Sequence, residues 1–150
     1  MGNGPLNYTT AIRADKTAAE CLAILGRSGA GAVAVTYADR KPTGLAFTLD
    51  TPHGPRSFEL PVNTAGVHRR LADAYRRRDI PLKNSGIDQA ERTSWRILKD
   101  WLEAQLAIID AQMVSLDQVM LPYLRVGPDR TLYEAYRERE DLVAIEAGHG

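Results

Sequence analysis

The sequence is poor in the residue patterns that usually indicate catalysis. Cys21 is the one cysteine among 150 residues, so neither an intramolecular disulfide nor a cysteine-based zinc site can form within one chain. The three histidines, His53, His68 and His149, lack metal-ligand spacing, and no HExxH or CxxC motif occurs. Carboxylates are spread singly rather than paired for acid–base chemistry. We therefore expect no enzymatic activity, no metal and no cofactor.

Long apolar runs and net charge are also lacking. No run reaches the roughly 18 apolar residues that can span a bilayer, and the N-terminal residues lack the charged-then-apolar pattern of a signal peptide. Nineteen basic residues balance nineteen acidic ones, which gives the whole molecule no bias toward nucleic acid or membrane. We expect a cytoplasmic protein without membrane contact, although a secreted protein without disulfides is the alternative.

The chain is otherwise globular in composition, with 44% hydrophobic and 25% charged residues. Its length is typical of one domain. We expect residues 1–13 to be loosely ordered, or to add an edge strand at Tyr8–Ile12. Residues 14–139 then form a single domain, and residues 140–150 form a flexible tail.

Periodicity and turn residues predict an α+β fold in helix-β-β-β-helix order, with a three-stranded antiparallel sheet. A long central helix and a short C-terminal helix pack on this sheet. The expected helices are Thr17–Arg27, Ala65–Arg78, Asp88–Met113, Leu116–Met120 and Thr131–Arg139, and the expected strands are Gly31–Tyr37, Gly44–Leu49 and Arg56–Leu60. GRSGAG at residues 26–31 lies between a helix and a strand and lacks the GKS/T ending, so it is a helix C-cap and turn rather than a phosphate loop.

Several helix starts and ends carry capping signals. Thr17 with Glu20, and Asp88 with Glu91, have capping-box spacing. Asn63 or Thr64 can cap the second helix, and Ser115 can open the short turn after the third. The inner stripe of the second helix is predicted to hold Val67, Leu71, Ala74 and Tyr75.

The two faces of the sheet differ in kind. Alternation places one strongly apolar set on the inner face, namely Val33, Val35, Tyr37, Leu45, Phe47, Leu49, Phe58 and Leu60. The other face holds mostly small residues such as Ala34 and Ala46, which would let a helix or another backbone approach closely. It can pack against another element of this chain, against a second protomer, or meet solvent or ligand.

The third helix carries the widest apolar surface and both tryptophans. Trp95, Leu98 and Leu102 repeat at helical spacing, and Trp101 widens the stripe. We expect this helix to be the central one, with Trp101 buried. The apolar run that follows it, Met113–Leu124, either seals the core or forms a subunit contact.

Charge is unevenly distributed along the chain despite the zero net charge. Residues 1–88 hold 12 basic and 8 acidic side chains, and residues 89–150 hold 7 and 11. Arginines and one lysine on the second and third helices form a candidate nucleic-acid-binding surface; these are Arg69, Arg70, Arg76, Arg77, Arg78, Arg92, Arg96 and Lys99. The competing interpretation is that the arginines pair with Asp73, Asp79 and the acidic C-terminal residues.

Five segments resemble a family of small uncharacterised proteins encoded in bacteriophages and prophage-like regions. They are NYTT (7–10), TGLAFTLDTPHG (43–54), ELPVN (59–63), WRILKDWLEAQLAII (95–109) and MVSLDQVMLPYL (113–124), and TLYEAY (131–136) completes the pattern. The resemblance covers nearly the whole chain and implies a host-cytoplasmic protein of a mobile element, without residue roles. In element order alone, the chain is similar to double-stranded-RNA-binding domains, and its sheet-plus-helix core to single-strand annealing proteins.

These observations favour a non-enzymatic accessory protein of a phage or mobile element that binds DNA or RNA through an arginine-rich helical surface. The alternative is a protein–protein interaction module, either a homo-oligomeric adaptor or an inhibitor of a host system, that does not contact nucleic acid.

Overall fold

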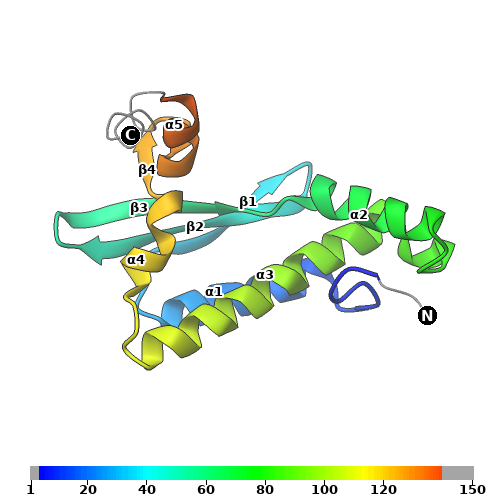
Figure 1. Cartoon of the computed structure of the whole chain (residues 1–150). Coiled ribbons are helices and arrows are strands. Elements are labelled where there is room, and N and C mark those ends of the chain that lie inside the picture. Colours follow the sequence, from blue (N-terminus) through cyan, green and yellow to red (C-terminus); the bar gives the residue numbers. More distant parts are fainter. Residues whose placement is uncertain (1–3, 140–150) are drawn as a thin grey trace, which may run out of the picture.

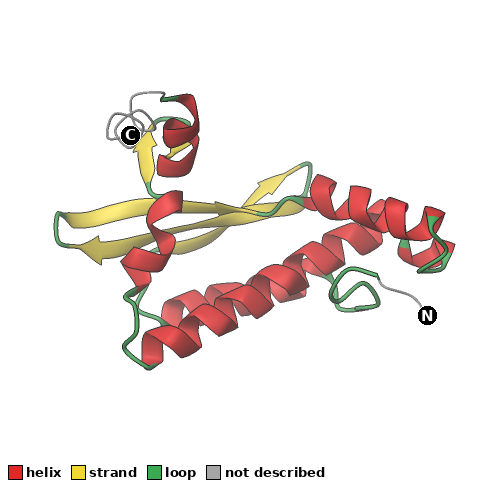
Figure 2. Cartoon of the chain, in the orientation of Figure 1, coloured by secondary structure: helices red, strands yellow, loops and turns green. Residues whose placement is uncertain are grey.

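The computed structural model describes residues 4–139 (Figures 1 and 2). A helix, three strands and four further helices follow one another as the sequence predicts, and two short strands that were not predicted precede the last helix. The α-helices are α1 (Ala14–Arg27), α2 (Thr64–Arg76), α3 (Ile87–Asp110), α4 (Leu116–Met120) and α5 (Leu132–Glu138). The strands are β1 (Val33–Ala38), β2 (Lys41–Thr51), β3 (Gly54–Pro61), β4 (Arg125–Gly127) and β5 (Arg130–Thr131). Short 3-10 turns occupy Leu82–Asn84 and Leu121–Tyr123. The α+β fold and the helix-β-β-β-helix order are confirmed. Within residues 4–139, no helix is long and apolar enough to cross a bilayer.

The main sheet is an antiparallel meander in the order β1-β2-β3. Phe47 on the middle strand lies opposite Val33 on one side and Phe58 on the other. The Phe47 and Phe58 rings stack with their centroids 5.6 Å apart. Both rings are buried on the inner face, as alternation predicts for β-strands.

Helices α1 and α3 run side by side below this inner face in the view of Figure 1. Trp95 of α3 is fully buried, and its indole N–H donates a hydrogen bond of 3.2 Å to the carbonyl oxygen of Pro42 in β2. Trp101 is only half-buried, and its ring meets the edge of Tyr123. The central position of α3 is therefore confirmed, but Trp95 rather than Trp101 is its buried anchor.

The outer face of the sheet is left largely uncovered. The C-terminal lobe, which we define as residues 121–139, stands on the side of the sheet opposite α1 and α3 (Figure 1). Arg125 of this lobe pairs with Glu59 of β3, while Ala34 and Ser57 elsewhere on the face are exposed. Packing of this face against another element of the chain is thus confined to the lobe.

Tyr37 departs from the predicted burial pattern. It was expected in the core, but 59% of its surface is exposed. The β1–β2 register shifts between Thr36 and Tyr37, so that Tyr37 pairs with Pro42. This irregularity interrupts the simple alternation on which the prediction rested.

Residues 4–13 form turns that lie along α3 rather than an edge strand at Tyr8–Ile12. Gln89 donates from its side-chain amide to the carbonyl of Thr10, at 2.9 Å, and the Thr93 hydroxyl donates to the carbonyl of Asn7. Tyr8 packs on a second small core that holds Leu71, Ala74, Ile80 and Ala90. This segment therefore closes one end of the helical layer. The expected tail at residues 140–150 lies outside the described residues.

Helices α1, α2 and α3 end in the same hydrogen-bonded arrangement, the Schellman motif. In α1 the amide of Ala30 donates to the carbonyl of Leu25, and Gly29 has a φ of +100°. In α2 the amide of Asp79 donates to Ala74, and in α3 the amide of Met113 donates to Ile108. The left-handed residue is glycine in α1, but Arg78 in α2 and Gln112 in α3. Met113 consequently lies past the end of α3 and is exposed.

Candidate nucleic-acid interface

Helix α2 and its C-cap residue, Arg77, carry four arginines on the side that faces away from the core. Its buried residues, Leu71 and Ala74, define the inner face. At about 100° per residue, the four arginines fall within a sector of roughly 120° on the other side. Together with Arg78 just past the helix, they form what we call the α2 arginine face: Arg69, Arg70, Arg76, Arg77 and Arg78. All five residues are exposed.

One carboxylate lies at the middle of this sector. Asp73 Oδ1 is 3.2 Å from Arg76 Nη2, and Asp73 Oδ2 is 3.3 Å from Arg77 Nη2. The two guanidinium side chains remain about two-thirds exposed despite these contacts. The predicted pairing of arginines with Asp73 therefore occurs, but a single carboxylate cannot neutralise the arginines that surround it. The α2 arginine face keeps a net positive charge.

Arg78 extends this face from a costly backbone conformation. Its φ is +62°, in the left-handed region that glycine occupies without penalty. For a side-chain-bearing residue this conformation costs about 1 kcal/mol or more. Neither Arg78 nor Arg69 forms an ion pair with any other residue in 4–139.

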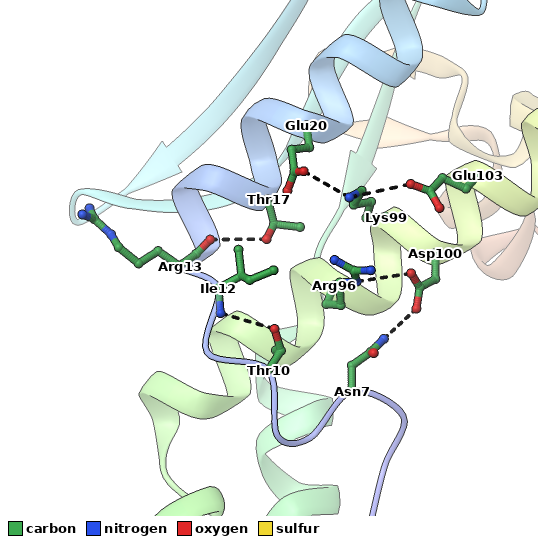
Figure 3. Close-up of polar contacts among 10 residues, drawn as sticks. All are labelled: Asn7, Thr10, Ile12, Arg13, Thr17, Glu20, Arg96, Lys99, Asp100 and Glu103. Carbon is green, nitrogen blue, oxygen red and sulfur yellow. Dashed lines mark hydrogen bonds and ion pairs between the residues drawn. The ribbon is translucent and has the colours of Figure 1, made fainter.

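The predicted cations of α3 belong to a different environment. Arg92, Arg96 and Lys99 were expected on an exposed face, but all three are half-buried. Figure 3 shows Arg96 and Lys99 between α3, α1 and the N-terminal segment. Arg96 Nε is 3.4 Å from Asp100 Oδ1, and Arg92 donates to the side-chain oxygen of Gln89. The structure thus does not join these three residues to the α2 arginine face.

The row formed by Arg92, Arg96 and Lys99 has a structural role, which Lys99 shows most clearly. Its ammonium group is 3.1 Å from Glu20 Oε2 of α1 and 3.7 Å from Glu103 Oε1 (Figure 3). Its side chain is only 13% exposed. Asn7 completes the row by donating to Asp100 at 2.6 Å. These contacts tie α1, α3 and residues 4–13 together, so the row is not available to a large ligand.

Tyr75 was expected in the inner stripe of α2 but is 42% exposed. In the helix it follows Ala74, which is buried, and precedes Arg76 on the cationic side. Its position at the border of the apolar stripe gives it one face to the core and one to solvent. An exposed aromatic ring is a usable stacking surface for a base, and sequence reasoning could have found it by allowing a narrower inner stripe.

Cys21 and Lys41, which lie outside α2, have raised pKa values. Within residues 4–139, no group of three or more His, Cys, Asp or Glu side chains could hold a metal ion. Burial raises the pKa of the Cys21 thiol to about 12, which makes it a poor nucleophile. A hydrogen bond from Lys41 to Glu91 raises the pKa of that lysine.

Comparison with protein-family profiles, with curated proteins and with solved structures gave no match to this chain. The resemblance to phage proteins accordingly stays a prediction.

Proposed function

We propose that this protein is a non-enzymatic accessory protein of a phage or mobile element that binds DNA or RNA through the α2 arginine face. The observation that carries the proposal is the gathering of five exposed arginines on α2 and its C-terminal turn, only two of which pair with Asp73. Cationic side chains that replace condensed counterions supply most sequence-independent affinity for nucleic acid.

The chemistry of the arginines supports phosphate as the group that is recognised. A guanidinium group presents several N–H donors in a planar fork that matches phosphate oxygens. Arg69 and Arg78 form no ion pair with residues 4–139, so their donors can meet a ligand without breaking an existing contact. Phosphate contacts of this kind position a protein on nucleic acid but do not read its sequence.

The backbone of Arg78 is a second support. A glycine at this position would complete the same motif without left-handed strain, as Gly29 does in α1. Strained conformations of this kind concentrate at functional sites. An arginine side chain at this position is explained if it contacts a ligand.

Binding to a labelled single-stranded and a labelled double-stranded oligonucleotide tests the proposal. The variant should combine Arg76→Ala, Arg77→Ala and Arg78→Gly, because alanine at position 78 would add strain that glycine avoids. We expect much weaker binding with a free energy of unfolding that changes by less than about 1 kcal/mol, as is usual for surface sites. Absence of binding by the parent protein at about 100 mM salt contradicts the proposal.

One observation favours the competing proposal, a protein–protein interaction module. The outer face of the sheet is hollowed beside the C-terminal lobe, over a volume of about 540 Å³ lined by small residues that include Ala32, Ala34 and Ala46. A second copy or a host protein could cover it. A mass measurement in solution tests this: a dimer that does not bind oligonucleotide would favour the module over the nucleic-acid-binding protein.

A further inference from the structure

Asp73 is placed to control which anions the α2 arginine face accepts. Its two carboxylate oxygens contact different guanidinium groups, Oδ1 with Arg76 and Oδ2 with Arg77. Both contacts run along the helix surface, at i,i+3 and i,i+4 spacing, so the carboxylate is tethered next to both arginines. Each arginine gives Asp73 one terminal nitrogen, so a phosphate that uses these nitrogens competes with the carboxylate.

On the basis of the proposed function, we propose that Asp73 is a tethered competitor that restricts this face to ligands with several linked phosphates. A single phosphate must displace a carboxylate that is always present at high effective concentration. A polynucleotide engages Arg69 and Arg78 at the same time, so its remaining phosphates are already held beside Arg76 and Arg77 when they compete with Asp73.

Electrostatic repulsion adds to this selection. Once a phosphate occupies Arg76 and Arg77, the Asp73 carboxylate remains within a few ångströms as a like charge. Each bound phosphate near Asp73 therefore has lower affinity than the number of arginines alone would give. Polyanions overcome this cost through additional contacts, whereas mononucleotides do not.

The test compares Asp73→Asn with the parent protein. Asparagine keeps the size of the side chain but removes the charge that holds the two arginines. The control is Asp110→Asn, which removes the same charge from an exposed residue at the far end of α3 (Figure 1). Melting curves of the three proteins establish that each is folded. Fluorescence anisotropy with a labelled oligonucleotide of about 20 nucleotides, competed by adenosine monophosphate, supplies both affinities.

We expect Asp73→Asn to bind the oligonucleotide about threefold tighter or more at about 100 mM salt, a change typical of losing a surface charge pair. The affinity for adenosine monophosphate should rise by a larger factor than the affinity for the oligonucleotide. The ratio of the two affinities, which measures the preference for the polymer, should therefore fall. Asp110→Asn should change neither affinity by more than about twofold.

The outcomes separate the two proposals. If the parent binds the oligonucleotide and Asp73→Asn weakens this binding or leaves it unchanged, the competitor role is overturned. The proposal of nucleic-acid binding then still stands. If neither the parent nor Asp73→Asn binds, both proposals are wrong. Binding by Asp73→Asn alone also overturns both, because the parent must bind the polymer if linked phosphates overcome Asp73.

Discussion

Arg78 occupies, at the end of α2, the place that Gly29 occupies at the end of α1. The amide of each residue donates to a carbonyl three residues earlier, and the amide of the following residue donates to one five residues earlier. Each residue has a positive φ, +62° for Arg78 and +100° for Gly29. The motif itself requires only a left-handed backbone, which glycine supplies most easily. The arginine therefore costs stability at an exposed position of the α2 arginine face.

This relationship predicts opposite effects of Arg78→Gly on stability and on binding. Removal of left-handed strain should raise the free energy of unfolding by about 1 kcal/mol. Loss of one phosphate contact should weaken oligonucleotide binding and lower the slope of log affinity against log salt by about 1. Urea denaturation and anisotropy titrations measure the two effects. Because the variant is more stable, its weaker binding could not be attributed to unfolding.

Two matched controls belong to this prediction. Arg40 also has a left-handed backbone, in the β1–β2 turn, so Arg40→Gly removes one charge and similar strain outside the α2 arginine face. Gln112→Gly relieves the same motif in α3 without a change of charge. Both variants should gain stability and bind like the parent. Equal weakening by Arg40→Gly would mean that affinity follows total charge rather than the α2 arginine face.

The two tryptophans of α3 should differ in their contribution to stability. Trp95→Ala removes a fully buried ring and its hydrogen bond to Pro42, and it should cost about 3–5 kcal/mol. Trp101→Ala should cost clearly less, because Trp101 is half-buried at the edge of the core. Chemical denaturation of both variants checks this order. A larger loss of stability for Trp101→Ala than for Trp95→Ala would contradict the core seen in the structure.

Lys99 should matter for stability but not for binding. Lys99→Ala leaves Glu20 of α1 without its partner and should destabilise the fold by about 1–3 kcal/mol. Oligonucleotide affinity should stay within about twofold of the parent, because the Lys99 side chain is largely buried and paired internally. A strong loss of affinity with unchanged stability would show that Lys99 belongs to the nucleic-acid interface.

Cys21 predicts a specific dependence of stability on alkaline pH. Burial raises the pKa of its thiol from 9.0 to about 12, so the folded protein retains a proton that the unfolded chain loses above about pH 9. Stability from this group is therefore fully present below pH 9 and is lost as pH rises toward 12. Cys21→Ala should remove that part of the decline. A thiol reagent that labels native Cys21 rapidly at pH 8 would contradict its burial.

The strands of the main sheet and the order of helices could be predicted from the sequence because their signals are local, whereas the short strands β4 and β5 were not predicted. Alternating residues marked β2 and β3, and Ser115 marked the start of α4, where the structure shows it in a capping box with Gln118. Asn63 likewise caps α2 by accepting from the amide of Gly66 at 2.8 Å. Each signal concerns residues within one turn or one strand, where pattern and structure coincide.

Helix starts were predicted less well, because a capping residue can serve another role. The capping box at Thr17 is wrong: α1 begins at Ala14, and the Thr17 hydroxyl donates to the Arg13 carbonyl one turn earlier. The capping box at Asp88 is also wrong, since α3 begins at Ile87 after Gly86. Threonine and aspartate satisfy the same pattern inside the first turn of a helix as they do at its cap.

Only part of the candidate site could be predicted from the sequence. Charge density alone could group the arginines of α2, since helical spacing brings residues 69, 70, 76 and 77 to one side. Whether the α3 cations were exposed depended on where α1 and residues 4–13 dock, which is set by long-range contacts such as Lys99 with Glu20. No local pattern contains that information.

The most direct test of the α2 arginine face is the salt dependence of oligonucleotide binding, with the parent compared to Arg76→Ala/Arg77→Ala/Arg78→Gly. If these side chains contact phosphates, log affinity should fall linearly with log salt. The variant should then lose about 2–3 from that slope, at roughly 0.7–0.9 per phosphate contact. An identical slope for the two folded proteins, or a parent that does not bind, would show that this surface does not meet nucleic acid.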